Sequence, residues 1–566
     1  MLDCRISGGT VVDGTGATGR QADVGIRDGR IVLVGTSDEP AARTIDADGL
    51  VVAPGFVDTH THLDAQLLWD PSAGPSLFHG VTTVIGGNCG FTIAPLEPSS
   101  VEYVRAMLAR VEGMPLDALI AGPTWDWTSF GQWLASFDGN IALNAGFLAG
   151  HSTIRRLAMG DAAIGQAAAS DDIATMCRLL DEAVSQGALG LSSSLGSTHH
   201  DGDGNPVPSR FATREEFVAL SRTLRDRPGT FLGLNPGVVP FEPAMVDLIT
   251  DMSVAARKTL TWNALIVEAN RPEVVDSAFA LADRAAARGG SVVAQVVPDP
   301  RLFYLSFGNG FILDSLPDWA FLFSLTPDER LRALADPDVR SRLTRGAADP
   351  SLIDALRGYT AWASMTLVET TAPAHAGLSG RTIGSIATEW GRDPFDTLAD
   401  LVIANGIDTC FTPRPRGDDD ASWRMRAELW CDPRTVIGAA DAGAHVDNAS
   451  SFTYTTSLIG PSVRDRGLLP LEEAVRQLTD VPARLCGLQG RGQVREGWAA
   501  DLVVFDPARI GPGPVHARTD LPGGARRLYA EADGMHAVLV NGQTVVVDGA
   551  FTGELPGVVL RSGRDT

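Results

Sequence analysis

Hydrophobic and polar residues alternate at both ends of the chain, and this pattern predicts short antiparallel strands. Residues 1–53 contain CRISGGTVVDG, ADVGIRDGRIVLVG and RTIDADGLVVAPG, with Asp-Gly turns between the apolar runs. The same pattern returns over residues 499–551, in AADLVVFDP and MHAVLVNGQTVVVDGAF. We therefore expect residues 1–53 and 487–566 to pair into one small β-sandwich domain built from both chain ends.

The pattern changes over residues 54–486, where short apolar runs alternate with amphipathic helical stretches such as SDDIATMCRLLDEAVSQG. Eight runs have the length and composition of buried strands: GFVDTHTHL, GVTTVIGGNCG, IALNAGFLAGHS, ALGLSSSLGS, TFLGLNPGVV, TLTWNALIV, SVVAQVVPD and TVIGAADAG. Strands that alternate with helices are typical of parallel sheets. The α/β pattern, with eight strands, predicts a (β/α)8 TIM barrel.

The segment from about 300 to 430 does not follow the strand–helix alternation and is predicted to be a helical insertion before the eighth strand. Insertions at the carboxyl ends of barrel strands often cover the active site. Trp319, Phe321, Phe323 and Trp362 in this segment could line a substrate pocket, although a role in a buried core is the alternative.

Composition narrows the classes of function. The 566 residues carry a net charge of 46 − 69 = −23, which disfavours binding to nucleic acid or to an anionic membrane. The six cysteines form no CxxC pair, no secretory signal begins the chain, and no run of about 18 apolar residues is present. We expect a cytoplasmic protein with a small-molecule substrate, and leave a homo-oligomer open.

Four polar side chains at the ends of three predicted strands together suggest a metal site. His60 and His62 in PGFVDTHTHLD are two residues apart, so they point to the same side of the first strand. Cys89 ends the second strand in GGNCG, and Asp441 ends the eighth in VIGAADAGAH. Imidazole, thiolate and carboxylate are the ligands that zinc prefers, and Asp441 could also take a proton from water.

Each of these residues has a structural alternative when it is taken alone. An isolated His-x-His can be a polar strand end, a free cysteine is usually a small buried hydrophobe, and an aspartate can cap a helix. Because all of them follow strands that end on the same predicted face, the joint interpretation as a metal site is favoured.

Longer stretches around these residues make the resemblance specific. PGFVDTHTHLD, HGVTTVIGGNCGFTIAPL, GHSTIRRLAMG, GALGLSSSLG, the late aspartate and QVREGWAADLVVFDP resemble the amidohydrolase superfamily, and within it the N-acyl-D-amino-acid deacylases. The resemblance covers nearly the whole chain. It implies hydrolysis of an amide-type C–N bond by metal-activated water, with His60, His62 and Asp441 at one metal position. It also implies that Cys89 replaces the bridging carboxylated lysine of the superfamily.

The sequence departs from this family at the fifth and sixth strands. The deacylases supply a histidine from each of these strand ends, whereas Asn235 and Asn263 stand there in this chain. Asparagine is a poor zinc ligand beside imidazole, and Lys258, the only lysine, begins the sixth strand and so lies at the wrong end to bridge metals. We expect a mononuclear Zn²⁺ site, with Asn235 and Asn263 bonded to water or substrate.

The cations that bind the substrate carboxylate in the family are also missing. Leu265 stands at the position of a lysine, and His445, Val446 and Asp447 replace a His-Pro-Arg motif. These changes favour a neutral or more apolar amide as substrate. A cyclic amide or imide, a carbamate, a urea or an ester are alternatives on the same site, and a metal-poor binding protein without turnover is the alternative from another class.

Further histidines were assigned by position alone. His151, with Arg155, ends the third strand in AGHSTIRR and is predicted to polarise the scissile carbonyl or hold substrate; a structural role is the alternative. His445 is a candidate rim residue, and the tract around His199 and His200 is predicted to be a solvated loop.

Overall fold

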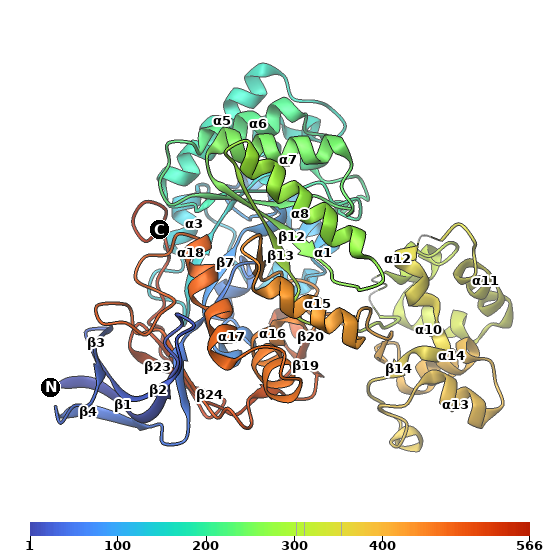
Figure 1. The fold of residues 1–566 in the computed structure, drawn as a ribbon. Helices are drawn as coiled ribbons and strands as arrows, with labels where there is room; N and C mark the ends of the chain where they lie inside the picture. The colour runs from blue at the N-terminus through green and yellow to red at the C-terminus, as the bar shows by residue number, and fades with distance from the viewer. Residues whose placement is uncertain (301–302, 309, 311, 353) are drawn as a thin grey trace.

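Both chain ends contribute strands to one nine-stranded sheet. The computed structural model describes residues 1–300, 303–308, 310, 312–352 and 354–566. The sheet follows the order β24-β23-β22-β17-β5-β1-β2-β3, with β4 added beside β1. Its strands are β1 (Leu2–Val11), β2 (Arg20–Arg27), β3 (Arg30–Gly35), β4 (Ala41–Asp46), β5 (Val51–Pro54), β17 (Leu502–Phe505), β22 (Met535–Val540), β23 (Gln543–Val547) and β24 (Ala550–Phe551). Figure 1 shows the blue N-terminal strands beside the red C-terminal strands.

The strands of this sheet pair where the sequence alternates. β17 pairs antiparallel with β5, so residues 51–54 and 502–505 lie side by side although they are far apart in the chain. Apolar side chains on one face, among them Val52, Leu502 and Leu539, form a separate small core. Between β17 and β22 the chain forms two separate two-stranded sheets, β18 (Gly511–Pro512) with β21 (Ala532–Asp533) and β19 (His516–Leu521) with β20 (Ala525–Tyr529).

The central part of the chain contains two parallel sheets. One has the order β6-β7-β8 and the other the order β16-β13-β12-β11-β10-β9. The strands are β6 (Phe56–Asp58), β7 (Val81–Gly86), β8 (Asn144–Phe147), β9 (Ala149–Gly150), β10 (Gly190–Ser194), β11 (Phe231–Asn235), β12 (Thr259–Leu265), β13 (Ser291–Val296) and β16 (Thr435–Ile437). Each of the eight expected strand segments contains at least one of these strands, and the third segment contains both β8 and β9. A parallel bridge between Thr61 and Ala442 joins the end that follows β6 to the end that follows β16.

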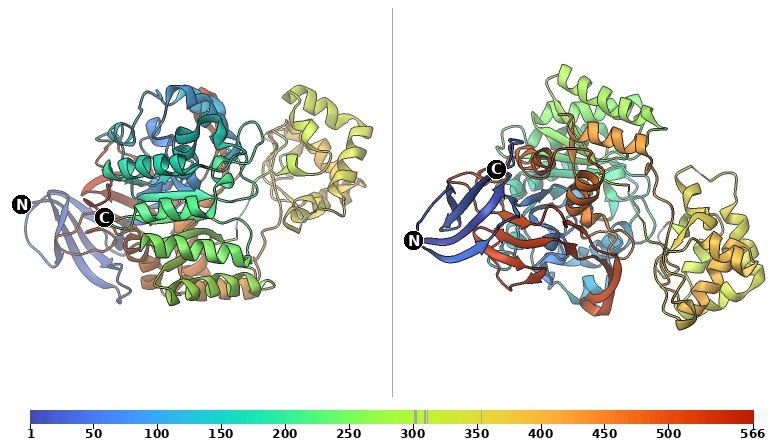
Figure 2. Two further views of the ribbon diagram at one scale, coloured as in Figure 1. Left: turned by 90° about the horizontal axis from the view of Figure 1, so that it is seen from above. Right: turned by 60° about the horizontal axis from the view of Figure 1, so that its bottom comes forward.

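Helices follow most of these strands and cover the outer side of the sheets. α5 (Ser170–Ser185), α6 (Arg214–Thr223), α7 (Pro243–Ala256) and α8 (Pro272–Ala287) pack in sequence against one another (Figures 1 and 2). The remaining helices of this part are α1 (Val101–Val111), α2 (Leu116–Ala121), α3 (Phe130–Ala135), α4 (His151–Met159), α15 (Asp420–Trp430), α16 (Tyr454–Ser457), α17 (Leu471–Leu478) and α18 (Asp480–Leu485). In α5, Met176, Leu180, Ala183 and Val184 are buried at helical spacing, which directs one face onto the sheet.

The predicted insertion forms a helical lobe with a core of its own. It contains α9 (Ala320–Phe323), α10 (Pro327–Ala335), α11 (Pro337–Ala347), α12 (Asp354–Arg357), α13 (Ile383–Trp390) and α14 (Pro394–Asn405), with β14 (Thr366–Leu367) paired to β15 (Phe411–Thr412). Both views of Figure 2 show this lobe standing beside the rest of the chain. Residues 301, 302, 309, 311 and 353, which the predicted insertion includes, lie outside the described residues.

The aromatic residues of the insertion build that core. Trp319 is buried, its indole N–H donates to the Leu343 carbonyl at 2.9 Å, and its ring stacks on Trp362 with centroids 5.5 Å apart. Phe321 and Phe323 pack against the same cluster. The core alternative is therefore confirmed for these four side chains, and the pocket-lining alternative is wrong.

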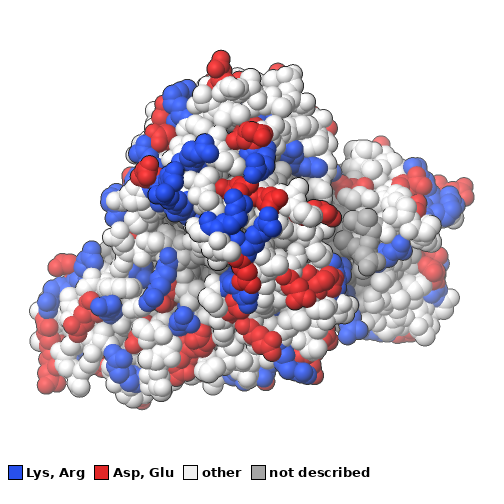
Figure 3. Space-filling model, turned by 45° about the horizontal axis from the view of Figure 1, so that its top comes forward, with Lys and Arg blue, Asp and Glu red and all other residues white. Residues whose placement is uncertain are grey.

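The surface carries side chains of both charges (Figure 3). On the face that Figure 3 shows, acidic and basic side chains are interspersed rather than gathered into one patch. Among the described residues, no helix combines the length and the apolar character that crossing a bilayer requires.

Candidate metal centre

The ends of the first and eighth strands are hydrogen-bonded to each other at the residues predicted to bind metal. The backbone N–H of Asp441 donates to the carbonyl of His60 at 3.1 Å, and the N–H of His62 donates to the carbonyl of Ala442 at 2.7 Å. Backbone pairing therefore sets the separation of the two segments before any side chain contributes. His60, His62 and Asp441 are brought together as the sequence predicted.

The side chains converge on one point. His60 Nε2 lies 3.1 Å from Asp441 Oδ1, and His62 Nε2 lies 3.8 Å from the same oxygen. Cys89 Sγ lies 3.7 Å from His60 Nε2. Ligand atoms of His60, His62 and Cys89 all lie within 4.8 Å of one another, a spacing that one tetrahedral metal ion can span.

Cys89 reaches this point from a tight loop after β7. Gly87 adopts a φ of +71°, and a Cβ there would lie 2.2 Å from the Leu148 carbonyl oxygen, so the close approach requires glycine. Asn263 Nδ2 lies 3.8 Å from Cys89 Sγ, and the Asn235 amide acts to lower the pKa of the same thiol. The two asparagines therefore contact the cysteine at the positions where the deacylases are expected to carry histidines.

Four residues at these strand ends have left-handed backbone conformations that non-glycine residues rarely adopt. The φ angles are +54° at Cys89, +60° at Ala439, +53° at Asp441 and +50° at His445. Such conformations cost on the order of 1 kcal/mol or more each and persist where the surrounding structure imposes them. Their concentration at one edge of the molecule agrees with a functional site there.

Buried ionisable groups around the cluster are short of positive charge. Burial raises the pKa of Asp58 to about 8 and that of Asp64 to about 7. Burial, with the nearby carboxylates of Asp441 and Asp64, raises the pKa of Glu112 well above its usual range. Within the described part of the chain, no arginine or lysine forms an ion pair with Asp58, Asp64 or Glu112. A divalent cation would supply the missing charge, so this surrounding fits a metal.

The donors themselves also suit a metal. Burial lowers the pKa of His62 to about 3, which keeps the imidazole neutral and able to coordinate. The Cys89 thiol has its pKa raised by burial and then by Glu112 and Asp441, while the amides of Asn263 and Asn235 act in the opposite direction. A metal at this position would favour the thiolate. The neutral imidazoles, the cysteine and the aspartate form the mixed set of nitrogen, sulfur and oxygen donors that zinc prefers.

The structure corrects the prediction for His151. Its ring is fully buried, with Nδ1 hydrogen-bonded to Ser193 Oγ at 2.8 Å and Nε2 to Glu216 Oε1 at 2.9 Å. Arg155 donates to both oxygens of the same Glu216, 2.7 and 2.5 Å away. Because both ring nitrogens are occupied, His151 cannot polarise a substrate carbonyl. His151 and Arg155 instead hold α4 against α6, which is the structural alternative.

A cavity of about 910 Å³ adjoins the cluster. His199 and His445 line it from the central part of the chain, and Phe303, Tyr359 and Arg414 line it from the insertion. Burial lowers the pKa of His199 to about 4, with smaller effects from His445 and Asp441. Ser197 and Thr198 in this tract are exposed and His199 and His200 are partly exposed, so the tract is a surface loop from which His199 also lines the cavity. The insertion covers this cavity with residues other than the four aromatics considered from the sequence.

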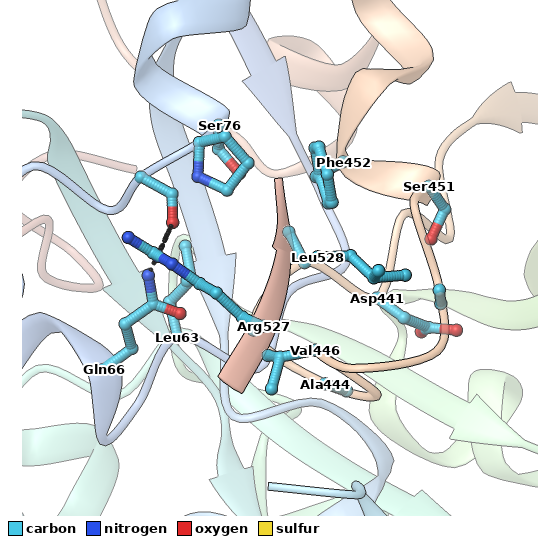
Figure 4. Close-up of a pocket in the computed structure, with 15 residues that line it drawn as sticks. Leu63, Gln66, Ser76, Asp441, Ala444, Val446, Ser451, Phe452, Arg527 and Leu528 are labelled. Carbon is cyan, nitrogen blue, oxygen red and sulfur yellow. Dashed lines mark hydrogen bonds between the residues drawn. The ribbon is translucent and has the colours of Figure 1, made fainter. Parts of the chain in front are cut away.

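A second pocket beside Asp441 is too small for a substrate. It measures about 20 Å³, enough for one water molecule. Figure 4 shows Asp441, Leu528 and Phe452 around it, with Arg527 on the opposite wall. Arg527 is neutralised by Asp520 at 2.8 Å and Asp70 at 3.3 Å. Of these two pockets, the larger cavity is the one with room for a substrate.

Sequence reasoning missed two residues of the site. Glu112, the residue after α1, lies 3.5 Å from His62 Nδ1 through its Oε1. His199 comes five residues after Ser194, the end of β10, and its Nδ1 is hydrogen-bonded to Ser194 Oγ at 2.8 Å. Because His199 comes shortly after a strand end, the sequence could have indicated that it lies at the site. No comparable indication exists in the sequence for Glu112, because this residue follows a helix and not a strand.

Comparisons with known proteins show which family this chain resembles in sequence and in fold. A model of the amidohydrolase family matches residues 43–234 and 368–546. D-aminoacylase of Alcaligenes xylosoxydans xylosoxydans is 30% identical over 563 residues, covering 99% of this chain and 97% of the relative. A structure described as showing the functional role of the binuclear metal centre in D-aminoacylase has a TM-score of 0.66 and 28% identity, covering 99% of this chain and 100% of the other. N-acyl-D-glutamate deacylase from Bordetella bronchiseptica, complexed with zinc and a phosphonate inhibitor, has a TM-score of 0.66 and 25% identity, covering 99% of each chain.

The buried carboxyl groups predict a pH dependence for the metal-free protein. Between about pH 6.5 and 8 the unfolded chain has already lost its carboxyl protons, since their ordinary pKa is near 4. Folded Asp58, with a pKa of about 8, retains its proton, so the folded state binds more protons. The free energy of unfolding should therefore fall as pH rises, by on the order of 1 kcal/mol per pH unit. The lowered pKa values of His62 and His199 act in the opposite direction only below about pH 6.5.

Urea unfolding of chelator-treated protein at several pH values measures this slope. The Asp58→Asn variant should have a shallower slope, and added Zn²⁺ should remove much of the loss at pH 8. A free energy of unfolding that is constant or rises over this window in the metal-free protein would contradict the assignment.

Proposed function

This chain belongs to the amidohydrolase family, and from that premise we propose that it is a metal-dependent hydrolase that cleaves the amide bond of a small N-acylated molecule. The observation that carries the proposal is the convergence of His60, His62, Cys89 and Asp441 on one point. The site is a divalent-metal site of the kind that its relatives occupy with zinc or copper. The relatives' names, D-aminoacylase and N-acyl-D-aspartate deacylase, indicate the class of bond.

We propose one Zn²⁺ per chain. The donors match zinc in type, and the second position that a binuclear site needs is occupied by Asn235 and Asn263 next to Cys89. Neutral amides bind zinc weakly beside imidazole. The Asn263 amide N–H instead donates to the sulfur, and both amides favour negative charge on Cys89 without a second cation.

We further propose that the two parallel sheets form a single (β/α)8 barrel. The Thr61–Ala442 bridge and the two backbone hydrogen bonds beside it support closure between the first and eighth strands. In this arrangement residues 1–53 and 487–566 form the small β domain and the segment from about 300 to 430 is the insertion. The site then lies at the carboxyl ends of the strands, where barrel enzymes place their chemistry.

The bound metal and Asp441 have different roles in the proposed hydrolysis. When bound, the metal lowers the pKa of water toward neutrality and polarises a carbonyl. Asp441 accepts the proton of the attacking water, since its Oδ1 lies 3.1 Å from His60 Nε2 and 3.8 Å from His62 Nε2. The water oxygen bonds to the carbonyl carbon, the C–N bond breaks, and Asp441 returns the proton to the leaving nitrogen. The products are a carboxylic acid and an amine.

The large cavity supports an anionic substrate rather than the neutral one that the sequence favoured. Four arginines that line it are paired: Arg110 with Asp314, Arg271 with Glu273, Arg416 with Glu268 and Arg526 with Glu369. Arg414 lines the same cavity, is exposed, and has no ion pair with any of the described residues. We propose that Arg414 binds the carboxylate of an N-acyl amino acid, in place of the cations missing at Leu265 and Asp447.

The Asp441→Asn variant tests the catalytic assignment. It should lower kcat by roughly 10²–10⁴-fold, because an amide cannot accept the proton of water. The assay is release of amine from a panel of N-acyl amino acids of both configurations, with metal content measured on the same samples. Asp314→Asn, at the far side of the cavity, is the control and should retain kcat. Full turnover by Asp441→Asn with metal bound would show that Asp441 is not the proton acceptor.

The Arg414→Gln variant tests the substrate assignment. Loss of one charge-assisted hydrogen bond should lower kcat/KM for an N-acyl amino acid by about 10- to 100-fold, mainly through KM. The same substrate with its carboxylate amidated should be affected little. Arg416→Gln is the matched control, since that guanidinium is already paired with Glu268 at 3.0 Å. An equal loss for the charged and the amidated substrate would contradict a carboxylate-binding role.

A further inference from the structure

Glu112 is a buried carboxyl group that no step of the proposed reaction uses. It is 3% exposed, and its Oε1 forms no hydrogen bond with any described residue. Nδ1 of His62, which could donate to this oxygen, lies 3.5 Å away. A buried carboxyl oxygen without a partner is costly, so its position beside a metal ligand needs an explanation.

His62 presents opposite ring nitrogens to two carboxyl groups. Its Nε2 faces Asp441 Oδ1 at 3.8 Å and its Nδ1 faces Glu112 Oε1 at 3.5 Å. An imidazole that coordinates metal through one nitrogen carries its proton on the other. The Nδ1–H of His62 would then point at Glu112. His60 differs, since its Nδ1 is buried without a partner among the described residues.

The backbone holds Glu112 against the loop that carries Asp441. The Glu112 carbonyl accepts a hydrogen bond from the N–H of His445 at 2.5 Å. Gly113 follows with a φ of +57°, and a Cβ on it would lie 3.1 Å from His445 Nδ1 and 3.3 Å from its Cα. Only glycine fits this contact without displacing the loop. The end of α1 is therefore fixed to the segment after the eighth strand, and the Glu112 side chain is directed at the centre of the cluster.

We propose that Glu112 is a positioning residue that accepts a hydrogen bond from His62 Nδ1–H and so fixes the tautomer and ring orientation with which Nε2 binds metal. The proposal rests on the metal site of the proposed function. Carboxylate partners of this kind orient histidine ligands and raise their basicity. Glu112 follows a helix, whereas the other proposed site residues follow strands. Its carboxylate would contribute negative charge, which the neutral amides of Asn235 and Asn263 do not.

Cobalt binding tests the role without relying on turnover. Wild type and variants, stripped of metal, are titrated with Co²⁺ and followed by their visible absorption. The Glu112→Gln variant keeps the size and an acceptor oxygen and should raise the Kd about 10-fold, while Glu112→Ala should raise it up to about 100-fold. Both should keep the wild-type band positions, because the atoms bound to cobalt are unchanged. Glu102→Gln, on the same helix and in an exposed pair with Arg105, should bind as wild type does.

Three outcomes would overturn the proposal. Equal Kd values for wild type and both Glu112 variants would show that Glu112 does not support His62. Shifted absorption bands in Glu112→Gln would make Glu112 a ligand in its own right. A wild-type protein that binds no cobalt would overturn the metal site itself, together with the role that rests on it, and is distinguished from the first outcome by the wild-type titration alone. Thermal unfolding of the metal-free forms shows whether Glu112→Ala is folded; Glu112→Gln carries the test if it is not.

Discussion

The pairing of the first strand's end with the eighth strand's end is the constraint on which the rest of the site depends. Two backbone hydrogen bonds, from Asp441 to His60 and from His62 to Ala442, join segments about 380 residues apart in the chain. Their geometry alone places three candidate ligands within reach of one ion. The intervening chain, with its six other strand segments and the helical insertion, brings these two ends together. Any change that opens this seam would separate the ligands.

The seam requires conformations that the chain would not otherwise adopt. Cys89, Ala439, Asp441 and His445 all have positive φ, and Gly87 and Gly113 allow contacts in which a Cβ would clash. The ionisable side chains are also in an unfavourable environment. Burial raises the pKa values of Asp58 and Asp64 and lowers that of His62. Metal-free, the site is electrostatically unfavourable; with a divalent cation, the same groups become its ligands and their supports.

The hydrophobic pattern of the sequence predicted those site residues that come directly after a strand. The His-x-His pair, Cys89 and Asp441 were identifiable because each comes directly after an apolar run, and parallel strand ends meet at one edge. The eight strand segments and the helical character of the insertion were predictable for the same reason. The role of His151 was not, because its partner Glu216 lies on α6 and nothing local indicates their contact. Glu112 was missed since its approach depends on how α1 packs against the loop at His445, which is a tertiary contact. The insertion's aromatic residues were ambiguous from sequence, and packing decided in favour of a separate core.

The central claim is that one metal ion is held by His60, His62, Cys89 and Asp441. Its most direct test is metal content by elemental mass spectrometry, on protein purified without added metal, for wild type and for His60→Ala. The account predicts about one zinc per chain in wild type and its loss in the variant, where one of the two imidazole ligands is gone. Two metals per chain would contradict the mononuclear site and the interpretation of Asn235 and Asn263. No metal, even after reconstitution with Zn²⁺, would contradict the metal centre itself.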